Sequence, residues 1–321
     1  MKNVIGVIPG RRSEKSDQSV VVGAHYDHIG TGWPDGREEN KGKVHPGADD
    51  NASGVAVLIE LARVLGKELK PDRTLVFVAF TGEEAGRKGS KYYVTNEKQF
   101  SAKKCIGMIN FDTVGRLGKK KLLVLGAGSA KEWVHIFRGA ASVTGVETEM
   151  VIERLDSSDN ISFEETGVPA VQLFSGPHLD YHRPTDTADK IDPQGLVKVA
   201  SIAKEAIEYL AKREEPLTST IIHEEQTESS TKKDRKVSLG IIPDFAYSGE
   251  GCRISGVMPG SPAEKSGLRE GDVIIRINSN PVYNLKALST ILKSLSPGSR
   301  ISVNILREGK EMMVETEVVE R

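Results

Sequence analysis

The chain has 321 residues, more than one hydrophobic core usually organises, so we expect two domains. Its 44 Lys and Arg nearly balance its 45 Asp and Glu, which gives no chain-wide electrostatic reason to bind nucleic acid or an anionic membrane. No run approaches the roughly 18 apolar residues of a membrane span, and the 2 cysteines fall in different predicted domains and imply no disulfide framework.

The chain begins almost directly in a predicted strand, and its first ten residues, MKNVIGVIPG, lack the long apolar core of a signal peptide. This start is compatible with a missing upstream segment. We therefore expect a soluble protein whose compartment the sequence leaves undetermined.

The first two thirds of the chain alternate between apolar runs and segments of helical periodicity. The runs are typical of buried parallel strands and cover Ser19–Ala24, Thr74–Phe80, Ile106–Phe111, Lys121–Leu125 and Pro169–Phe174. The helical segments are Ser53–Leu65, Glu83–Tyr93, Ala130–Thr144 and Gln194–Arg213. This alternation predicts an α/β fold with a mostly parallel sheet sandwiched by helices. Ligands of such sheets bind beyond the carboxyl ends of the strands.

The composition then changes twice. Residues 213–236 are charged and rich in Ser and Thr, which predicts a linker. Residues 237–321 contain short predicted strands and one helix, separated by turn signals such as PGSP, REGD and SPGS. These elements are Gly251–Val257, Val273–Ile277, Leu285–Leu295 (the helix), Arg300–Arg307 and Glu311–Val319. We therefore expect domains at 1–212 and 237–321, the second small and mainly β.

Five potential metal ligands lie at predicted strand ends or in the loops that follow them: His25, Asp49, Glu84, Asp112 and His182. A single residue of this kind is more often a solvated or capping residue than a metal ligand. Together, two imidazoles and three carboxylates suit two zinc ions. One carboxylate must then bridge, so that each ion has three protein ligands and an open position. The set predicts a metallohydrolase, and His28, His45 and His178 are left out because five ligands complete it.

Neighbouring residues fit this chemistry. Asp27 and Asp186 could accept the second imidazole N–H of His25 and His182. Glu83 and Glu84 start a predicted helix, where the helix dipole favours acids; in a dinuclear site one binds metal and the other accepts a proton from water. Ordinary helix-start acids explain the pair equally. The stretch around Asp49–Asp50 has its own alternative, an Asx turn with a helix cap at Ser53.

The motifs HYD, GADDNASG, GEE, NFD and YHRPTDT occur in the order and spacing of peptidase family M28, the co-catalytic zinc aminopeptidases, which residues 3–212 resemble. The resemblance implies the zinc exopeptidase fold and two Zn²⁺ ions. It assigns His25 and Asp112 to one ion, Glu84 and His182 to the other, and Asp49 as the bridge. Glu83 would be the general base.

Two further positions follow from the same resemblance. Tyr181 matches a position where some members use a tyrosine to stabilise the oxyanion; a packed pocket aromatic is its plain alternative. The segment Ser157–Asn160 matches a substrate-pocket segment that often has His or Tyr where this chain has Asn160, so the side-chain preference stays open. Export from the cell is a further implication of the resemblance.

Residues 237–321 resemble a PDZ domain of the bacterial, circularly permuted arrangement, through VSLGI, RISGVMPGSPAEKSGLREGDVI and the terminal LREGKE hairpin. Backbone N–H groups of Leu239–Ile241 would then receive the C-terminal carboxylate of a peptide that adds a strand beside them. The same residues also suit a module that only packs on its neighbour.

The leading hypothesis is an aminopeptidase that removes N-terminal residues from peptides by metal-activated water, with Glu83 as the base. A carboxypeptidase would need a cationic clamp, for which Arg154 and Arg183 are candidates. Glutaminyl cyclases resemble a mononuclear variant of the fold without the first His, and His25 argues against that transferase. A non-catalytic, zinc-stabilised adaptor acting through its PDZ-like domain would have no use for Glu83.

Overall fold

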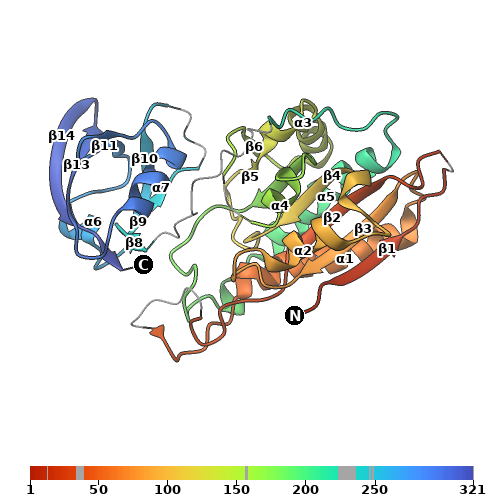
Figure 1. Cartoon of the computed structure of the whole chain (residues 1–321), viewed down its shortest axis with the longest axis horizontal. Helices are drawn as coiled ribbons and strands as arrows, with labels where there is room; N and C mark the ends of the chain where they lie inside the picture. Colours follow the sequence, from red (N-terminus) through yellow and green to blue (C-terminus); the bar gives the residue numbers. More distant parts are fainter. Residues whose placement is uncertain are drawn as a thin grey trace. The chain divides into compact units, whose positions relative to one another are not determined.

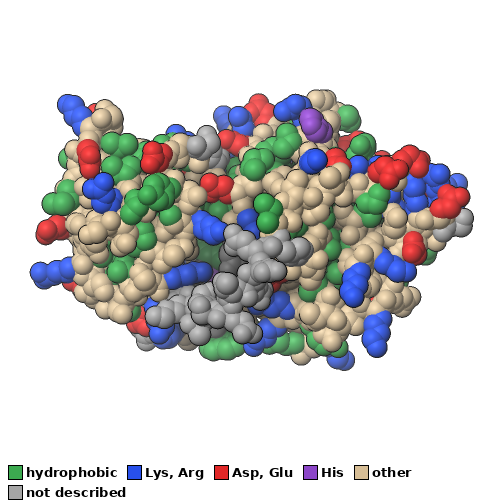
Figure 2. All heavy atoms as spheres, turned by 45° about the horizontal axis from the view of Figure 1, so that its top comes forward, with side chains coloured by type: hydrophobic (Ala, Val, Ile, Leu, Met, Phe, Trp, Pro, Cys, Tyr) green, Lys and Arg blue, Asp and Glu red, His purple; other side chains and the backbone are tan. Residues whose placement is uncertain are grey.

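The computed structural model describes residues 1–12, 14–33, 40–155, 158–222, 236–245, 247 and 249–320. They form two compact units, the first within residues 1–176 and 180–222 and the second within residues 177–179 and 236–320 (Figure 1). Each unit has a hydrophobic core of its own. Among the described residues, no helix is long and apolar enough to cross a membrane. On the face drawn in Figure 2, acidic and basic side chains are interspersed.

The first unit is built on a seven-stranded sheet with the order β1-β3-β2-β4-β7-β5-β6. Its four central strands, β3, β2, β4 and β7, are parallel as predicted. β1 is antiparallel to β3, and β5 is antiparallel to β7 while β6 runs parallel to β5. The strands are β1 (Val4–Ile8), β2 (Ser19–His25), β3 (Thr74–Phe80), β4 (Cys105–Phe111), β5 (Leu122–Leu125), β6 (Thr148–Val151) and β7 (Ala170–Phe174).

Helices cover both faces of this sheet, because successive strand residues point to opposite sides. Val20 and Val22 of β2 pack with helices α1 (Gly54–Glu68), α3 (Trp133–Thr144) and α5 (Pro193–Lys212). Val21 of β2 belongs to the core on the other face, which includes residues of α2 (Lys88–Asn96) and α4 (Asn160–Glu164). The apolar stripe of α1 is thereby buried, and each fully buried leucine contributes about 1.5–3 kcal/mol.

The turn after β3 differs from the prediction of a helix starting at Glu83. Helix α2 begins only at Lys88. Before it, the amides of Gly86 and Arg87 both donate to the Glu83 carbonyl at 2.8 Å, and Arg87 adopts a left-handed conformation with φ of 59°. Glu83 and Glu84 therefore lie in a loop and not in the first turn of a helix.

The prediction of a linker is also wrong for residues 213–222. Residues 213–222 return to the first unit, where Leu217 is buried in the main core and Ser219 forms a bridge with Ala130. The fully buried Arg73 donates to the carbonyls of Arg213 and Glu214, at 2.5 and 2.8 Å. The remainder of the predicted linker, 223–235, lies outside the described residues.

The second unit contains an antiparallel sheet in the order β14-β13-β11-β10-β9, with β12 beside β11 and a separate β8–β15 pair. The strand β9 forms one edge of this sheet. Helices α6 (Pro262–Lys265) and α7 (Leu285–Ser294) complete the unit. Its strands are β8 (Val237–Ser238), β9 (Ile241–Pro243), β10 (Cys252–Val257), β11 (Val273–Ile277), β12 (Asn280–Pro281), β13 (Arg300–Arg307), β14 (Lys310–Glu317) and β15 (Val319–Glu320).

Candidate metal centre

Two histidines and three carboxylates lie close together at one edge of the sheet. They come from the ends of β2 and β4, from the turn before α1 and from the loops after β3 and β7. Nε2 of His25, the last residue of β2, lies 3.3 Å from Asp50 Oδ1 and 3.6 Å from Asp112 Oδ2. Nε2 of His182 lies 3.1 Å from both Asp50 Oδ2 and Glu84 Oε2. The two oxygens of Asp50 thus face two different ligand sets.

These separations fit zinc. Ligands about 2.0–2.1 Å from a tetrahedral zinc lie roughly 3.3 Å from one another, which is the range found around both histidines. Among the described residues, buried His25 Nε2 and Asp50 Oδ2 have no hydrogen-bond partner, as expected of atoms that would bind metal. The sets His25, Asp50, Asp112 and His28, Asp50, Glu84 each place three ligand atoms close together. The residues present therefore fit two ions.

Asp50 occupies the place that the sequence resemblance gave to Asp49. The Asp49 carboxylate is turned toward the chain after β4: its Oδ1 accepts from Gly115 N at 2.6 Å and from Ser53 Oγ at 2.9 Å. Consecutive residues of a tight turn point in different directions, and only the fold decides which one faces the histidines. The expectation that Asp49 lies between the two histidines is wrong, because the Asp50 carboxylate lies there instead.

His28 was left out of the predicted set but lies beside it. Its Nδ1 is 2.8 Å from Glu84 Oε1 and 3.9 Å from Asp50 Oδ2, and its ring meets that of His182 edge-on at 5.6 Å between centroids. Its place three residues after His25, at the same strand end, was the signal available in the sequence.

The two aspartates expected to orient the histidines make other contacts. His25 Nδ1 lies 3.0 Å from the backbone oxygen of Asp27 and 3.8 Å from its carboxylate. That carboxylate accepts from the amides of Glu83 and Glu84 at 3.1 and 3.3 Å. Asp186 Oδ2 likewise accepts from two consecutive amides, those of Asp49 and Asp50. Each aspartate thus holds a loop that carries an acidic pair.

Burial and neighbouring charges separate the ionisation of Glu83 from that of Glu84. Burial, together with the carboxylates of Asp159 and Asp112, raises the pKa of Glu83 well above its usual value although His25 opposes this. Burial also disfavours charge on Glu84, but hydrogen bonds with His182 and His28 prevail and lower its pKa. A raised pKa suits a group that accepts and returns a proton, and a lowered one suits a ligand.

Part of the predicted pocket segment lies close enough to this cluster for the charges of His25 and Asp112 to act on Asp159. Ser157 is outside the described residues, whereas Ser158 accepts a hydrogen bond from Asn110 at 2.9 Å and Asp159 is fully buried. Burial raises the pKa of Asp159 to about 6. Asn160, also buried, donates to Glu164 at 3.2 Å.

Tyr181 and Arg154 are two further residues that the sequence analysis considered for contact with the substrate. Tyr181 stacks on His182 at 3.9 Å between ring centroids and remains 43% exposed, so it borders the cluster on an open side. Arg154, considered as a clamp for a substrate carboxylate, lies 3.2 Å from Glu164 Oε2. The Arg154 guanidinium therefore already has an acidic partner.

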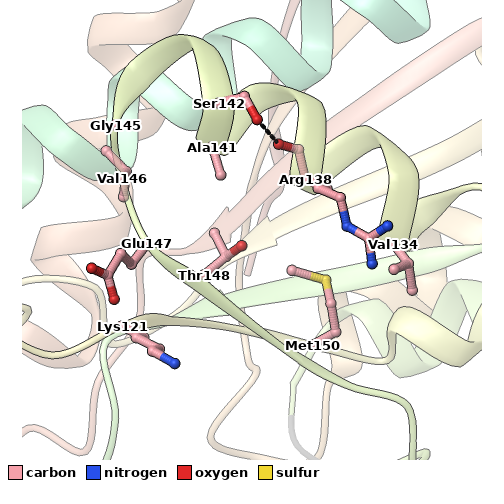
Figure 3. A pocket seen from close by; sticks show the side chains of 10 residues that line it. All are labelled: Lys121, Val134, Arg138, Ala141, Ser142, Gly145, Val146, Glu147, Thr148 and Met150. Carbon is pink, nitrogen blue, oxygen red and sulfur yellow. Dashed lines mark hydrogen bonds between the residues drawn. The ribbon is translucent and has the colours of Figure 1, made fainter.

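A hollow of about 500 Å³ lies elsewhere, between α3 and β6. Figure 3 shows Met150, Val134 and Ala141 around it, with Lys121, Arg138 and Glu147 at its rim. None of the metal-centre residues lines it. Its lining offers no set of metal ligands, so this hollow is not the reaction site.

The strand ends of this α/β unit thus present histidines and carboxylates as two sets of ligand atoms that could hold metal ions. The profile of peptidase family M28 matches residues 3–207, well over half of the chain, and the chain belongs to this family. The PDZ domain profile matches residues 225–318.

Similar proteins carry related descriptions. Aminopeptidase YwaD of Bacillus subtilis is 29% identical over 66% of this chain and 45% of its own length. Leucine aminopeptidase 1 of Arthroderma otae is 32% identical over 65% of this chain and 58% of its own. The chain thus spans about half the length of these relatives.

Solved structures agree with the fold. An aminopeptidase from Aneurinibacillus sp. strain AM-1 superimposes with a TM-score of 0.54 at 33% identity, covering 68% of this chain and 50% of that one. A zinc aminopeptidase from Bacillus subtilis gives a TM-score of 0.56 at 27% identity, covering 68% and 53%.

Proposed function

We propose that this chain is a dizinc aminopeptidase in which Asp50 is the ligand common to both ions. The observation that carries the proposal is the position of the two Asp50 oxygens, one beside His25 and the other beside His182. His25 and Asp112 would hold one zinc, and His182 and Glu84 the other. The similar proteins described as aminopeptidases support this activity.

Zinc, when bound, lowers the pKa of water and polarises the scissile carbonyl. Glu83 is the side chain that takes the proton from the attacking water and returns it to the leaving amine. Asp27 holds it in place through the backbone amide of Glu83. Tyr181 is exposed beside His182. Its hydroxyl would donate a hydrogen bond to the oxyanion that develops on the substrate.

The charge of the site favours a substrate with a free α-ammonium group. The zinc ions would neutralise the carboxylates that hold them, Asp50, Glu84 and Asp112, so the buried carboxylates left to attract an ammonium group are Glu83 and its neighbour Asp159. A peptide with a blocked N-terminus forfeits that attraction. This charge pattern supports an aminopeptidase over a carboxypeptidase.

The PDZ-like domain would bind the C-terminal part of a peptide. Strand β9 is an edge of its sheet, so a peptide strand can be added beside it. Gly240 N donates to Ser238 Oγ at 3.0 Å, so the predicted carboxylate loop is partly held by its own side chain. We take residues 1–222 as the catalytic unit. Export of the protein rests on family resemblance alone.

The test is hydrolysis of matched substrates. Aminoacyl p-nitroanilides with a free N-terminus, their N-acetylated counterparts and a C-terminal-carboxylate reporter are compared with zinc-loaded protein. The proposal predicts turnover of the free substrates and at least a hundredfold lower turnover of the others. Equal rates on free and blocked substrates would refute the aminopeptidase assignment.

A further inference from the structure

A carboxylate outside the predicted ligand set holds the turn that carries Asp50. Asp186, four residues after His182, is fully buried. Its Oδ2 accepts from Asp49 N at 2.9 Å and from Asp50 N at 3.1 Å, and its main-chain oxygen accepts from Ala48 N at 3.2 Å. Three consecutive amides of the turn therefore converge on one residue.

The remaining oxygen of this carboxylate is fixed by an ion pair. Asp186 Oδ1 accepts from Arg116 Nη2 at 3.0 Å. The other guanidinium nitrogen, Nη1, contacts Asp180 Oδ2 at 3.3 Å, and Asp180 in turn pairs with Lys190 at 2.6 Å. Because Arg116 follows Asp112 by four residues, the ion pair ties the loop after β4 to the loop of His182.

We propose that Asp186 is a positioning residue for metal binding: it joins the loops of His182, Asp112 and Asp50 and so aims both oxygens of Asp50 at the two ligand sets. Charged hydrogen bonds to backbone amides are among the stronger ones, and buried partners of this kind typically tune metal affinity by 10–100-fold. The inference rests on the proposed role of Asp50 as the shared ligand.

The substitution Asp186→Asn tests this role with little change in shape. In the native side chain, Oδ2 faces two N–H donors and Oδ1 faces a guanidinium donor. An amide has only one oxygen and brings two N–H donors of its own, so one of these contacts becomes donor against donor. Asp180→Asn is the matched control, because it makes the same change in a carboxylate that pairs with Arg116, here through Nη1, and with Lys190 as well.

The measurement is zinc affinity by chelator competition, with circular dichroism and thermal unfolding of the metal-free chains beside it. We expect Asp186→Asn to weaken zinc binding by about 10–100-fold, and Asp180→Asn to change it by less than about threefold. Parental affinity in a folded Asp186→Asn chain, or equal losses in the two variants, would overturn the proposal.

Two further variants distinguish a failure of the positioning role of Asp186 from a failure of the proposed shared ligand, Asp50. Arg116→Gln leaves Asp186 in place without its ionic partner and should weaken zinc binding severalfold. If Asp186→Asn does not fold, parental affinity in Arg116→Gln contradicts the proposal. Asp50→Asn tests the underlying assignment: parental affinity there would refute the shared ligand itself. Loss in Asp50→Asn with none in Asp186→Asn would refute only the positioning role.

Discussion

The acidic residues of the candidate metal centre differ in what their side chains contact. Glu84 and Asp50 lie against imidazole nitrogens, whereas Asp27 and Asp186 accept backbone amides. Burial, with the carboxylates of Asp159 and Asp112, raises the pKa of Glu83, although His25 opposes this shift. The roles proposed for these residues follow from these contacts and from burial.

Replacing Glu83 by Gln should abolish most turnover and leave zinc in place. The amide has the same size but cannot accept the proton, and general-base catalysis contributes about 10²–10⁴-fold. The checks are kcat on an aminoacyl substrate and zinc content by elemental analysis. Glu84→Gln is the control and should instead lose zinc. A Glu83→Gln enzyme with near-parental kcat would move the base to another residue.

The buried Glu164 should make stability depend on pH. Burial raises its pKa to about 7, against the pull of Arg154. The native state therefore holds a proton that the unfolded chain loses near pH 4.5, and stability from this group falls as pH rises from about 5 to 7. Glu164→Gln should remove that part of the decline, seen by urea unfolding at pH 5 and 8.

Glu165→Gln is the matched control, since it makes the same change on a more exposed neighbour and should keep the parental pH dependence. If Glu164→Gln declined as the parent does, the raised pKa would not be the cause.

The residue types and their strand-end positions could be predicted from the sequence, whereas their orientation could not. The carboxyl ends of β2 and β4 bring His25 and Asp112 together by topology. The choice between Asp49 and Asp50 depends on how the turn before α1 is held by Asp186 and Gly115, contacts that reach 137 and 66 residues along the chain. No local pattern contains that information.

At the scale of elements, long apolar runs were predictable and short or irregular ones were not. Strands β2, β3 and β4 are continuous apolar segments buried on both faces. The start of α2 was missed because the acidic pair Glu83–Glu84 is typical of a helix start, whereas the amides of these two residues donate to the Asp27 carboxylate and the turn stays non-helical. The packing of residues 213–222 on the first unit was missed for a similar reason. Their composition is mostly polar and charged, and Leu217 is the one buried apolar residue among them.

Because residues 213–222 pack on the first unit, we expect that unit to need them for full stability. A chain ending at residue 222 should unfold at a Tm several degrees above one ending at 212. The shorter chain exposes the core around Leu217 and removes the carbonyls that Arg73 uses, and an unsatisfied buried donor costs about 1–3 kcal/mol. Differential scanning calorimetry decides this. Identical Tm values would show that residues 213–222 behave as a linker after all.

At the scale of the whole molecule, two units with separate cores predict separable activities. The 1–222 chain should retain kcat/KM on small aminoacyl substrates within about threefold, because every residue of the metal centre lies in it. Longer peptides with a free C-terminus should lose more, since a peptide bound at Leu239–Ile241 has a raised effective concentration. C-terminally amidated peptides are the control. Equal loss on all substrates would mean that the second unit shapes the active site itself.

The most direct test of the central claim is zinc stoichiometry in the parent chain and in its two neighbouring variants, Asp49→Asn and Asp50→Asn. Isothermal titration of the metal-free proteins, with elemental analysis after dialysis, gives the number of ions bound. We predict two zinc ions for the parent and for a folded Asp49→Asn chain, and a loss of tight binding in Asp50→Asn. One ion in the parent, or two in Asp50→Asn with the loss in Asp49→Asn, would contradict Asp50 as the shared ligand.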